Sequence, residues 1–129
     1  MNKPILCLDF DGVLHSYESG WKGADVIPDP PVPGAMEFLR DATEYFDLWI
    51  FSSRSHQLGG IDAMRVWLKE HLIETFGVET ACSLAAQIKM ATDKPAAFLT
   101  IDDRTMQFTG VWPNPSDLLT FKPWNKSIV

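Results

Sequence analysis

Short apolar runs recur along this chain and are separated by polar or helical stretches. Residues 5–8 (ILCL) and 48–51 (LWIF) are continuous apolar runs typical of short interior strands. Residues 97–101 (AFLTI) form a third, nearly continuous apolar run that predicts another strand. Residues 78–82 are a weaker strand candidate, and residues 118–121 are a possible edge strand. The chain therefore offers three clear strands and two weaker ones.

Helical periodicity appears between these runs. Apolar residues at spacings of three and four predict amphipathic helices that pack on a sheet. The first helix has Ala35, Leu39, Ala42 and Phe46; the second has Ile61, Met64, Leu68 and Leu72 and ends near Gly77; the third has Leu84, Ile88 and Ala91 and is capped by Ser83. Residues 15–34 are a Pro- and Gly-rich loop. Strands that alternate with helices predict an α/β fold.

Composition narrows the function classes. A chain of 129 residues with 46% hydrophobic and 22% charged residues is typical of one soluble globular domain. We find neither a run of membrane-spanning length nor a signal-peptide pattern, so we expect a cytoplasmic protein that does not bind membranes. The net charge of −6 argues against strong nucleic-acid binding. Cys7 and Cys82 are expected to be reduced, buried thiols, and no Cys/His spacing indicates zinc.

Polar residues follow three of the predicted strands. Asp9 and Asp11 come after the first strand, Ser52 after the second, and Asp102 and Asp103 after the third. The carboxyl ends of parallel strands meet at one sheet edge, where such folds bind ligands. Carboxylates at such short distances repel one another unless a divalent cation such as Mg²⁺ or a shared proton lies between them. The alternative is that each acid belongs only to a local turn or a solvated loop.

The motifs LDFDGV (8–13), IFSS (50–53) and TIDDR (100–104) resemble those of the haloacid dehalogenase (HAD) superfamily of phosphohydrolases. The resemblance covers Pro4 to Arg104, in the family's order. It implies a three-layer Rossmann-like fold with a central, mainly parallel sheet, in a single domain over residues 1–129. It also implies an Mg²⁺-dependent phosphatase that hydrolyses phosphomonoesters through an aspartyl-phosphate intermediate.

The resemblance assigns a role to each motif residue. Asp9 would be the nucleophile that attacks phosphorus. Asp11 would be the general acid, which requires a raised pKa. Ser52 would hydrogen-bond the phosphoryl group. Asp102 would bind Mg²⁺ together with Asp9 and the main-chain carbonyl of Asp11, and Asp103 would support the metal directly or through water.

The family also implies an active-site lysine, and two candidates remain open. Lys94 begins a segment, KPAA, similar to that of small relatives without a cap domain, but a straight strand would place it at the wrong end of the sheet. Lys89 falls on the predicted crossover helix, whose side chains lean toward the active edge. Arg54 and Arg104 directly follow two motifs; each would either grip phosphate or pair with a clustered acid.

The interval between the first two motifs is too short for a full cap domain. We therefore expect specificity to come from residues 15–31, including Tyr17, Trp21 and Lys22, or from a partner subunit. His15 and His56 each follow a motif by a few residues, so they would either line the mouth of the site or be ordinary loop histidines, which is the commoner case.

Several functional alternatives stay open. The SSR and DDR segments are similar to those in the phosphatase domain of polynucleotide kinases, so nucleotide or polynucleotide phosphate ends are one alternative to a phosphorylated small molecule. A phosphotransferase and a non-catalytic module that binds Mg²⁺ and phosphate are the others. We expect Trp112 and Trp124 to pack on the core or cover a sheet edge.

Overall fold

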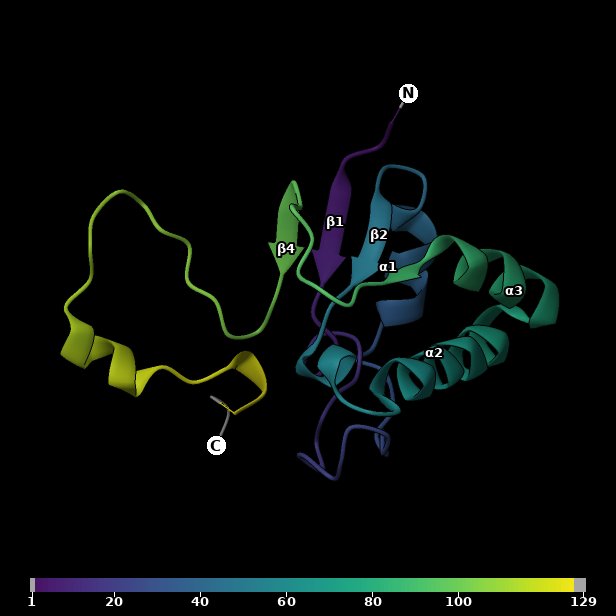
Figure 1. Ribbon diagram of the computed structural model, residues 1–129, viewed down its shortest axis with the longest axis horizontal. Coiled ribbons are helices and arrows are strands. Elements are labelled where there is room, and N and C mark those ends of the chain that lie inside the picture. Colours follow the sequence, from purple (N-terminus) through teal and green to yellow (C-terminus); the bar gives the residue numbers. More distant parts are fainter. Residues whose placement is uncertain (1, 127–129) are drawn as a thin grey trace.

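The computed structural model describes residues 2–126 and has an α/β architecture with a four-stranded, all-parallel sheet (Figure 1). The strand order is β3-β2-β1-β4. The strands are β1 Ile5–Leu8, β2 Asp47–Ile50, β3 Lys89–Met90 and β4 Leu99–Ile101. The α-helices are α1 Ala35–Ala42, α2 Gly60–Phe76 and α3 Val78–Gln87, and the 3-10 helices are η1 Ser53–His56, η2 Pro115–Thr120 and η3 Trp124–Lys126.

The carboxyl ends of the three strands that carry the motifs lie level with one another. β1 lies between β2 and β4, with Leu8 opposite Ile50 on one side and Ile101 on the other. The pairing continues past the strand ends, because Phe51 N–H donates to the Leu8 carbonyl at 3.1 Å and Asp9 N–H donates to the Ile101 carbonyl at 2.9 Å. The prediction that the motif residues share one sheet edge is confirmed.

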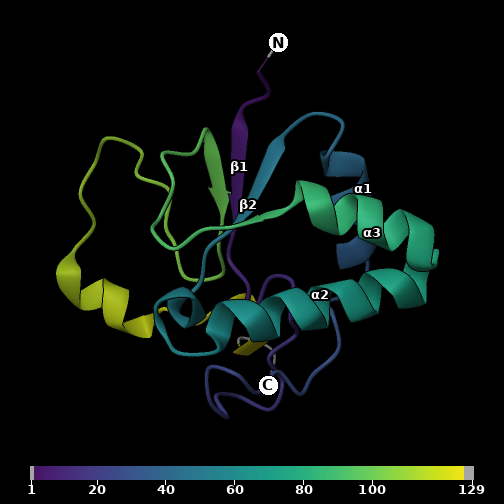
Figure 2. The same cartoon turned by 45° about the vertical axis from the view of Figure 1, so that its right-hand side comes forward.

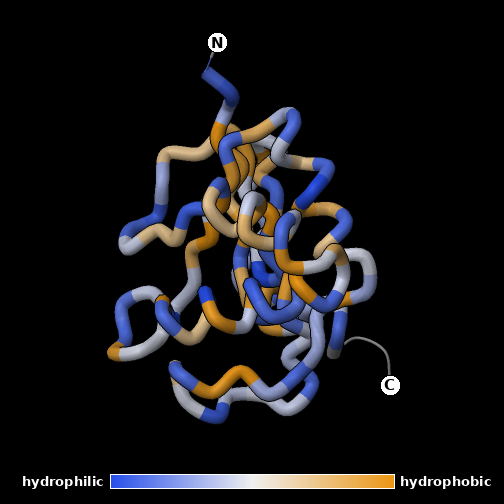
Figure 3. The backbone as a smooth tube through the Cα atoms, turned by 90° about the vertical axis from the view of Figure 1, so that its right-hand side faces the viewer, coloured by the Kyte–Doolittle hydropathy of each residue, from blue (hydrophilic) through white to orange (hydrophobic). Residues whose placement is uncertain are grey.

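One hydrophobic core joins the sheet to all three α-helices. Alternation along the strands directs Leu6, Leu8, Leu48 and Ile50 into this core. The helices contribute Met36 and Leu39 from α1, Met64, Trp67, Leu68 and Leu72 from α2, and Ala81 and Leu84 from α3. Figure 2 shows α2 and α3 side by side, and Figure 3 shows hydrophobic stretches running through the middle of the body.

Both of the weaker strand predictions, for residues 78–82 and 118–121, are wrong. Residues 78–82 begin helix α3, which packs on α2 through Ala81 and Leu84; Ser83 lies inside this helix and does not cap it. Residues 88–91 are extended rather than helical, and they include β3. Residues 118–121 are not a strand, because Pro115 and the Asn114 side chain, which accepts from Ser116 N–H, begin the 3-10 helix η2.

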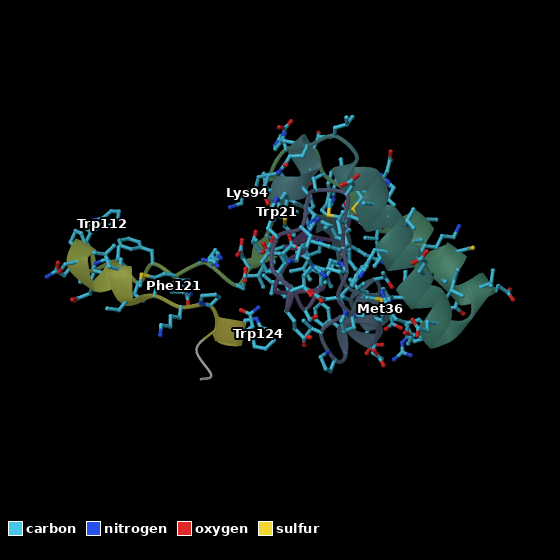
Figure 4. All side chains as sticks on the ribbon, turned by 90° about the horizontal axis from the view of Figure 1, so that it is seen from below. Trp21, Met36, Lys94, Trp112, Phe121 and Trp124 are labelled. Atoms are coloured by element: carbon cyan, nitrogen blue, oxygen red, sulfur yellow. The ribbon has the colours of Figure 1, made fainter. Side chains whose placement is uncertain are left out.

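The chain after β4 forms an arm that extends away from the body (Figure 1). Trp112 and Phe121 lie on this arm, whereas Trp124 lies where the chain returns to the body (Figure 4). Trp112 is 83% exposed, so the prediction that it packs on the core or a sheet edge is wrong. Within residues 2–126, no helix combines the length and apolar character needed to cross a bilayer.

Both cysteines are free thiols. Cys7 is buried in β1, as predicted, and burial raises the pKa of its thiol. Cys82 is exposed on α3, so the prediction of two buried thiols is half wrong. Cys82 is exposed because residues 78–87 are helical, so that Ala81 faces the core and the adjacent Cys82 faces away from it.

Candidate metal and phosphate site

Three carboxylates gather at the carboxyl edge of the sheet. Asp9 follows β1, and Asp102 and Asp103 follow β4, the neighbouring strand. One oxygen from each of Asp9, Asp102 and Asp103 can be chosen so that all three lie within 4.8 Å of one another. Oxygen donors at this spacing suit a hard divalent cation such as Mg²⁺. The sequence prediction that these residues come together is confirmed.

The electrostatics of Asp9 reflect this crowding. Burial raises the pKa of Asp9 to about 8, and the charge of Asp102 and the hydrogen bond and charge of Asp103 push it in the same direction. The hydrogen bond from the Phe10 backbone amide acts in the opposite direction. A cation in the cluster would remove this repulsion and release the proton. The cluster therefore fits a metal ion on the chemistry of its donors as well as on their spacing.

Gly12 allows the close approach that brings Asp103 to the cluster. Its φ of +81° lies in the left-handed region, which favours glycine. A Cβ atom placed on Gly12 would lie 2.2 Å from Asp103 Oδ2 and 2.8 Å from Asp103 Cγ. A side chain at position 12 would therefore displace the Asp103 carboxylate.

Ser52 is placed to donate a hydrogen bond into the site. It is buried and lines the same cavity as Asp9. Its Oγ caps helix η1 by accepting from Arg54 N–H at 3.2 Å, and its own N–H donates to Ser55 Oγ at 3.2 Å. Since the Ser52 hydroxyl accepts in this cap, its proton remains available for a phosphoryl oxygen.

The Asp11 carboxylate takes part in a separate, buried network. Arg54 Nε donates to Asp11 Oδ2 at 2.9 Å, and His15 Nδ1 lies 2.9 Å from Asp11 Oδ1. His15 and Arg54 are both 0% exposed. Asp29 N–H donates to His15 Nε2 at 3.1 Å, which leaves the His15 proton on Nδ1, where it donates to Asp11.

The expectation of a raised pKa for Asp11 is wrong. Burial alone would raise it, but the hydrogen bonds from His15 and Arg54, together with the Arg54 charge, outweigh burial and hold the pKa of Asp11 below its ordinary value. Asp9 is the carboxyl with the raised pKa. The charges of Asp102 and Asp103 act on Asp9, because Asp9 lies within the cluster that these two acids form.

Arg54 joins the Asp11 network to the loop before α1. Of the two roles left open for Arg54, the ion pair with an acid is the one found. Its guanidinium carbon also lies 4.7 Å from the centre of the Trp21 ring. Its Nη1 donates to three loop carbonyls, those of Gly23, Ala24 and Val26.

The structure separates the two lysine candidates. Lys89 begins β3, and its Nζ lies 3.1 Å from Asp47 Oδ2 at the opposite, amino edge of the sheet. The structure therefore does not bring Lys89 to the acids. Lys94 lies in the segment that crosses from Ile50 at the carboxyl edge back to Ile5 at the amino edge.

Lys94 is close enough to β1 for its charge to lower the pKa of Cys7, a thiol on which Asp9 and Asp102 also act. The segment is not a straight strand, which removes the objection raised from the sequence. Of the two lysines, Lys89 is held at the amino edge by Asp47, so Lys94 stays the candidate for the site.

A cavity of about 180 Å³ opens beside these groups. Its lining residues are Asp9, Asp11, Tyr17, Trp21, Ser52, Ser53, Asp103 and Arg104. A larger cavity of about 440 Å³ lies at the amino edge, where Lys89 and Asp47 line it. The smaller cavity is the candidate site, because it alone of the two contains the clustered carboxylates.

Some contributors were missed by sequence reasoning. An ordinary loop position was the favoured interpretation of His15, and Asp29 was not considered. His15 nevertheless contacts Asp11, and the Asp29 N–H holds His15 in place. Trp124 Nε1 donates to the Gly12 carbonyl at 2.8 Å, so the C-terminal segment returns to the Asp-rich loop. Of the three loop residues expected to set specificity, Tyr17 and Trp21 line the cavity, and Lys22 does not.

No protein-family model matches the chain, and neither a curated protein nor a solved structure gives a significant match.

Proposed function

We propose that this protein is an Mg²⁺-dependent phosphomonoester hydrolase of the HAD type, and that Asp9 is its nucleophile. The observation that supports this proposal best is the convergence of Asp9, Asp102 and Asp103 beside Ser52 at one sheet edge. The HAD-like, three-layer version of the α/β fold belongs to the proposal, as does a substrate that is a phosphorylated small molecule or nucleotide.

In the first step an Asp9 carboxylate oxygen attacks phosphorus and the bond from phosphorus to the ester oxygen breaks. The leaving oxygen takes the proton that Asp11 carries and departs as the alcohol. In the second step water attacks phosphorus, gives its proton to Asp11 and releases inorganic phosphate and free Asp9. When bound by Asp9, Asp102 and Asp103, Mg²⁺ supplies the positive charge that lets a carboxylate approach a phosphate.

The network around Asp11 favours the second step, in which Asp11 accepts a proton, over the first step, in which Asp11 donates one. His15 and Arg54 hold Asp11 ionised, so it is ready to accept a proton from the attacking water. Before the first step it must take up a proton against these two partners. Substrates whose leaving oxygen needs little protonation are therefore expected to react fastest.

The decisive assay is hydrolysis of p-nitrophenyl phosphate. We expect turnover with Mg²⁺ that EDTA abolishes, and we expect Asp9→Asn to remove it while circular dichroism shows an unchanged fold. Asp41→Asn, an exposed acid on α1, is the matched control and should retain activity. Mg²⁺ binding without hydrolysis would instead support the non-catalytic module.

A further inference from the structure

The candidate cavity is lined by two chemically different kinds of side chain. Asp9, Asp103 and Ser52 supply oxygen ligands and a hydroxyl, while Tyr17 and Trp21 supply aromatic rings. Its volume of about 180 Å³ corresponds to about six water molecules at about 30 Å³ each. A phosphoryl group and part of a ring fit such a space. The acids account for the phosphoryl end, and the two rings are left without a role in the proposed hydrolysis.

The Trp21 ring is fixed from one side by a buried cation. The Arg54 guanidinium carbon lies 4.7 Å from the ring centre, and Arg54 is itself held by Asp11 and by loop carbonyls. Arg54 does not line the cavity, whereas Trp21 does and is 45% exposed. The cavity therefore meets a part of the ring that the guanidinium leaves uncovered. A ring held in this way loses little conformational entropy when a ligand binds.

Tyr17 is fixed by the same network. Its ring packs edge-to-face on the buried His15, with 5.9 Å between ring centres. Its φ of +60° places it among the few non-glycine residues of the left-handed region. Burial raises the pKa of the Tyr17 phenol, and the Asp11 charge raises it further, so the phenol stays neutral. The two rings thus form a preformed aromatic part of the cavity lining.

We propose that Tyr17 and Trp21 form a subsite for a planar aromatic ring carried by the alcohol part of the phosphomonoester. This rests on the proposed function, because the acid cluster places the phosphoryl end. A planar π system gains from stacking on such rings, whereas a saturated ring or an open chain of similar size does not. Arg104, which also lines the cavity, is available to a further polar group on the substrate.

The test compares benzyl phosphate with cyclohexylmethyl phosphate. Both release a primary alcohol, so the leaving oxygens are closely matched and only the planarity of the ring differs. We expect the wild-type kcat/KM to be higher for benzyl phosphate by about tenfold, which corresponds to about 1.4 kcal/mol. The preference should lie mainly in KM, because stacking acts on the bound substrate as well as on the transition state.

Substitutions of Trp21 test whether the preference for benzyl phosphate comes from this ring. Trp21→Leu should reduce it to about twofold or less, and Trp21→Phe should restore most of it, since phenylalanine keeps a π face. Trp112→Leu is the matched control, because Trp112 is 83% exposed on the arm and does not line the cavity; it should leave the preference unchanged. Inhibition by inorganic phosphate should stay the same in all three variants.

Equal wild-type kcat/KM values for the two esters would overturn the subsite and leave the proposed hydrolysis intact. If neither ester is hydrolysed, the subsite is tested instead by calorimetric binding of benzylphosphonate and cyclohexylmethylphosphonate with Mg²⁺. The proposed function fails only if p-nitrophenyl phosphate is not hydrolysed either. Preferential binding of benzylphosphonate supports the subsite, and equal or absent binding rejects it. Esters that carry a phenyl, pyrimidine or purine ring then show which source of planar ring the subsite accepts.

Discussion

Gly12→Ala is expected to weaken metal binding beyond its effect on stability. The substitution forces a side chain into a backbone with φ +81°, which costs about 1–2 kcal/mol for an L-residue. It also places Cβ at 2.2 Å from Asp103 Oδ2, a separation that no pair of nonbonded atoms tolerates. The Asp103 carboxylate is the atom group that must move, and it is one of the three metal-ligand candidates.

Gly34→Ala separates the two effects. Gly34 has a similar φ of +88°, but a Cβ there would meet nothing within 4 Å. Both variants should lose about 1–2 kcal/mol of unfolding free energy in urea titrations. Only Gly12→Ala should lower the Mg²⁺ affinity measured by calorimetry, by about tenfold or more if one carboxylate ligand is lost, since about 1.4 kcal/mol corresponds to tenfold. Equal Mg²⁺ affinity in the two variants would refute the placement of Asp103 in the metal site.

Three other predictions concern single groups. Lys94→Ala should lower turnover, while Lys89→Ala, at the opposite sheet edge, should not; equal kinetics in the two variants would remove Lys94 from the site. Arg54→Met should lower the unfolding free energy by about 3 kcal/mol, because it removes the buried cation from a part-buried Asp11 carboxylate that then keeps only the His15 hydrogen bond. The exposed Arg40→Met should cost less than about 1 kcal/mol. The pKa of Asp9 is about 8 in the folded, metal-free protein and 3.8 ordinarily. The stability that protonated Asp9 contributes should therefore be fully present below pH 3.8 and be lost as the pH rises through about 8. Mg²⁺ affinity should therefore rise up to that pH by about tenfold per unit, and a flat profile would contradict the shift.

The strands and the acid cluster were predictable because both depend on local sequence. Continuous apolar runs mark β1 and β2, and the acids directly follow strands whose parallel pairing puts their ends at one edge. The placement of Asp9 directly beside Asp102 and Asp103 depends in addition on β1 and β4 being neighbours, a pairing that local sequence does not specify. The type of element was harder to predict over residues 78–87. This short, Ala-rich segment is compatible with a strand or a helix, and it is helical because it packs on α2.

The Asp11 network was not predictable because it depends on the path of an irregular loop. Residues 15–34 have no periodicity, so nothing in their sequence indicates that Asp29 N–H reaches His15 or that loop carbonyls reach Arg54. The consequence is chemical, since these contacts reverse the expected pKa shift of Asp11. The position of Lys94 was obscured in the same way, by a connecting segment that folds back across the sheet.

The proposed mechanism requires Asp9 to carry the phosphoryl group during turnover. The most direct measurement is rapid acid quench of the wild-type protein with p-nitrophenyl phosphate and Mg²⁺, followed by mass spectrometry of its peptides after reduction of the acyl phosphate with borohydride. We predict that borohydride reduces Asp9, and this reduced residue is the label that mass spectrometry detects. The label should be absent when EDTA is present and absent from Asp9→Asn. Turnover without any label at Asp9, or a label on another residue, would contradict the account.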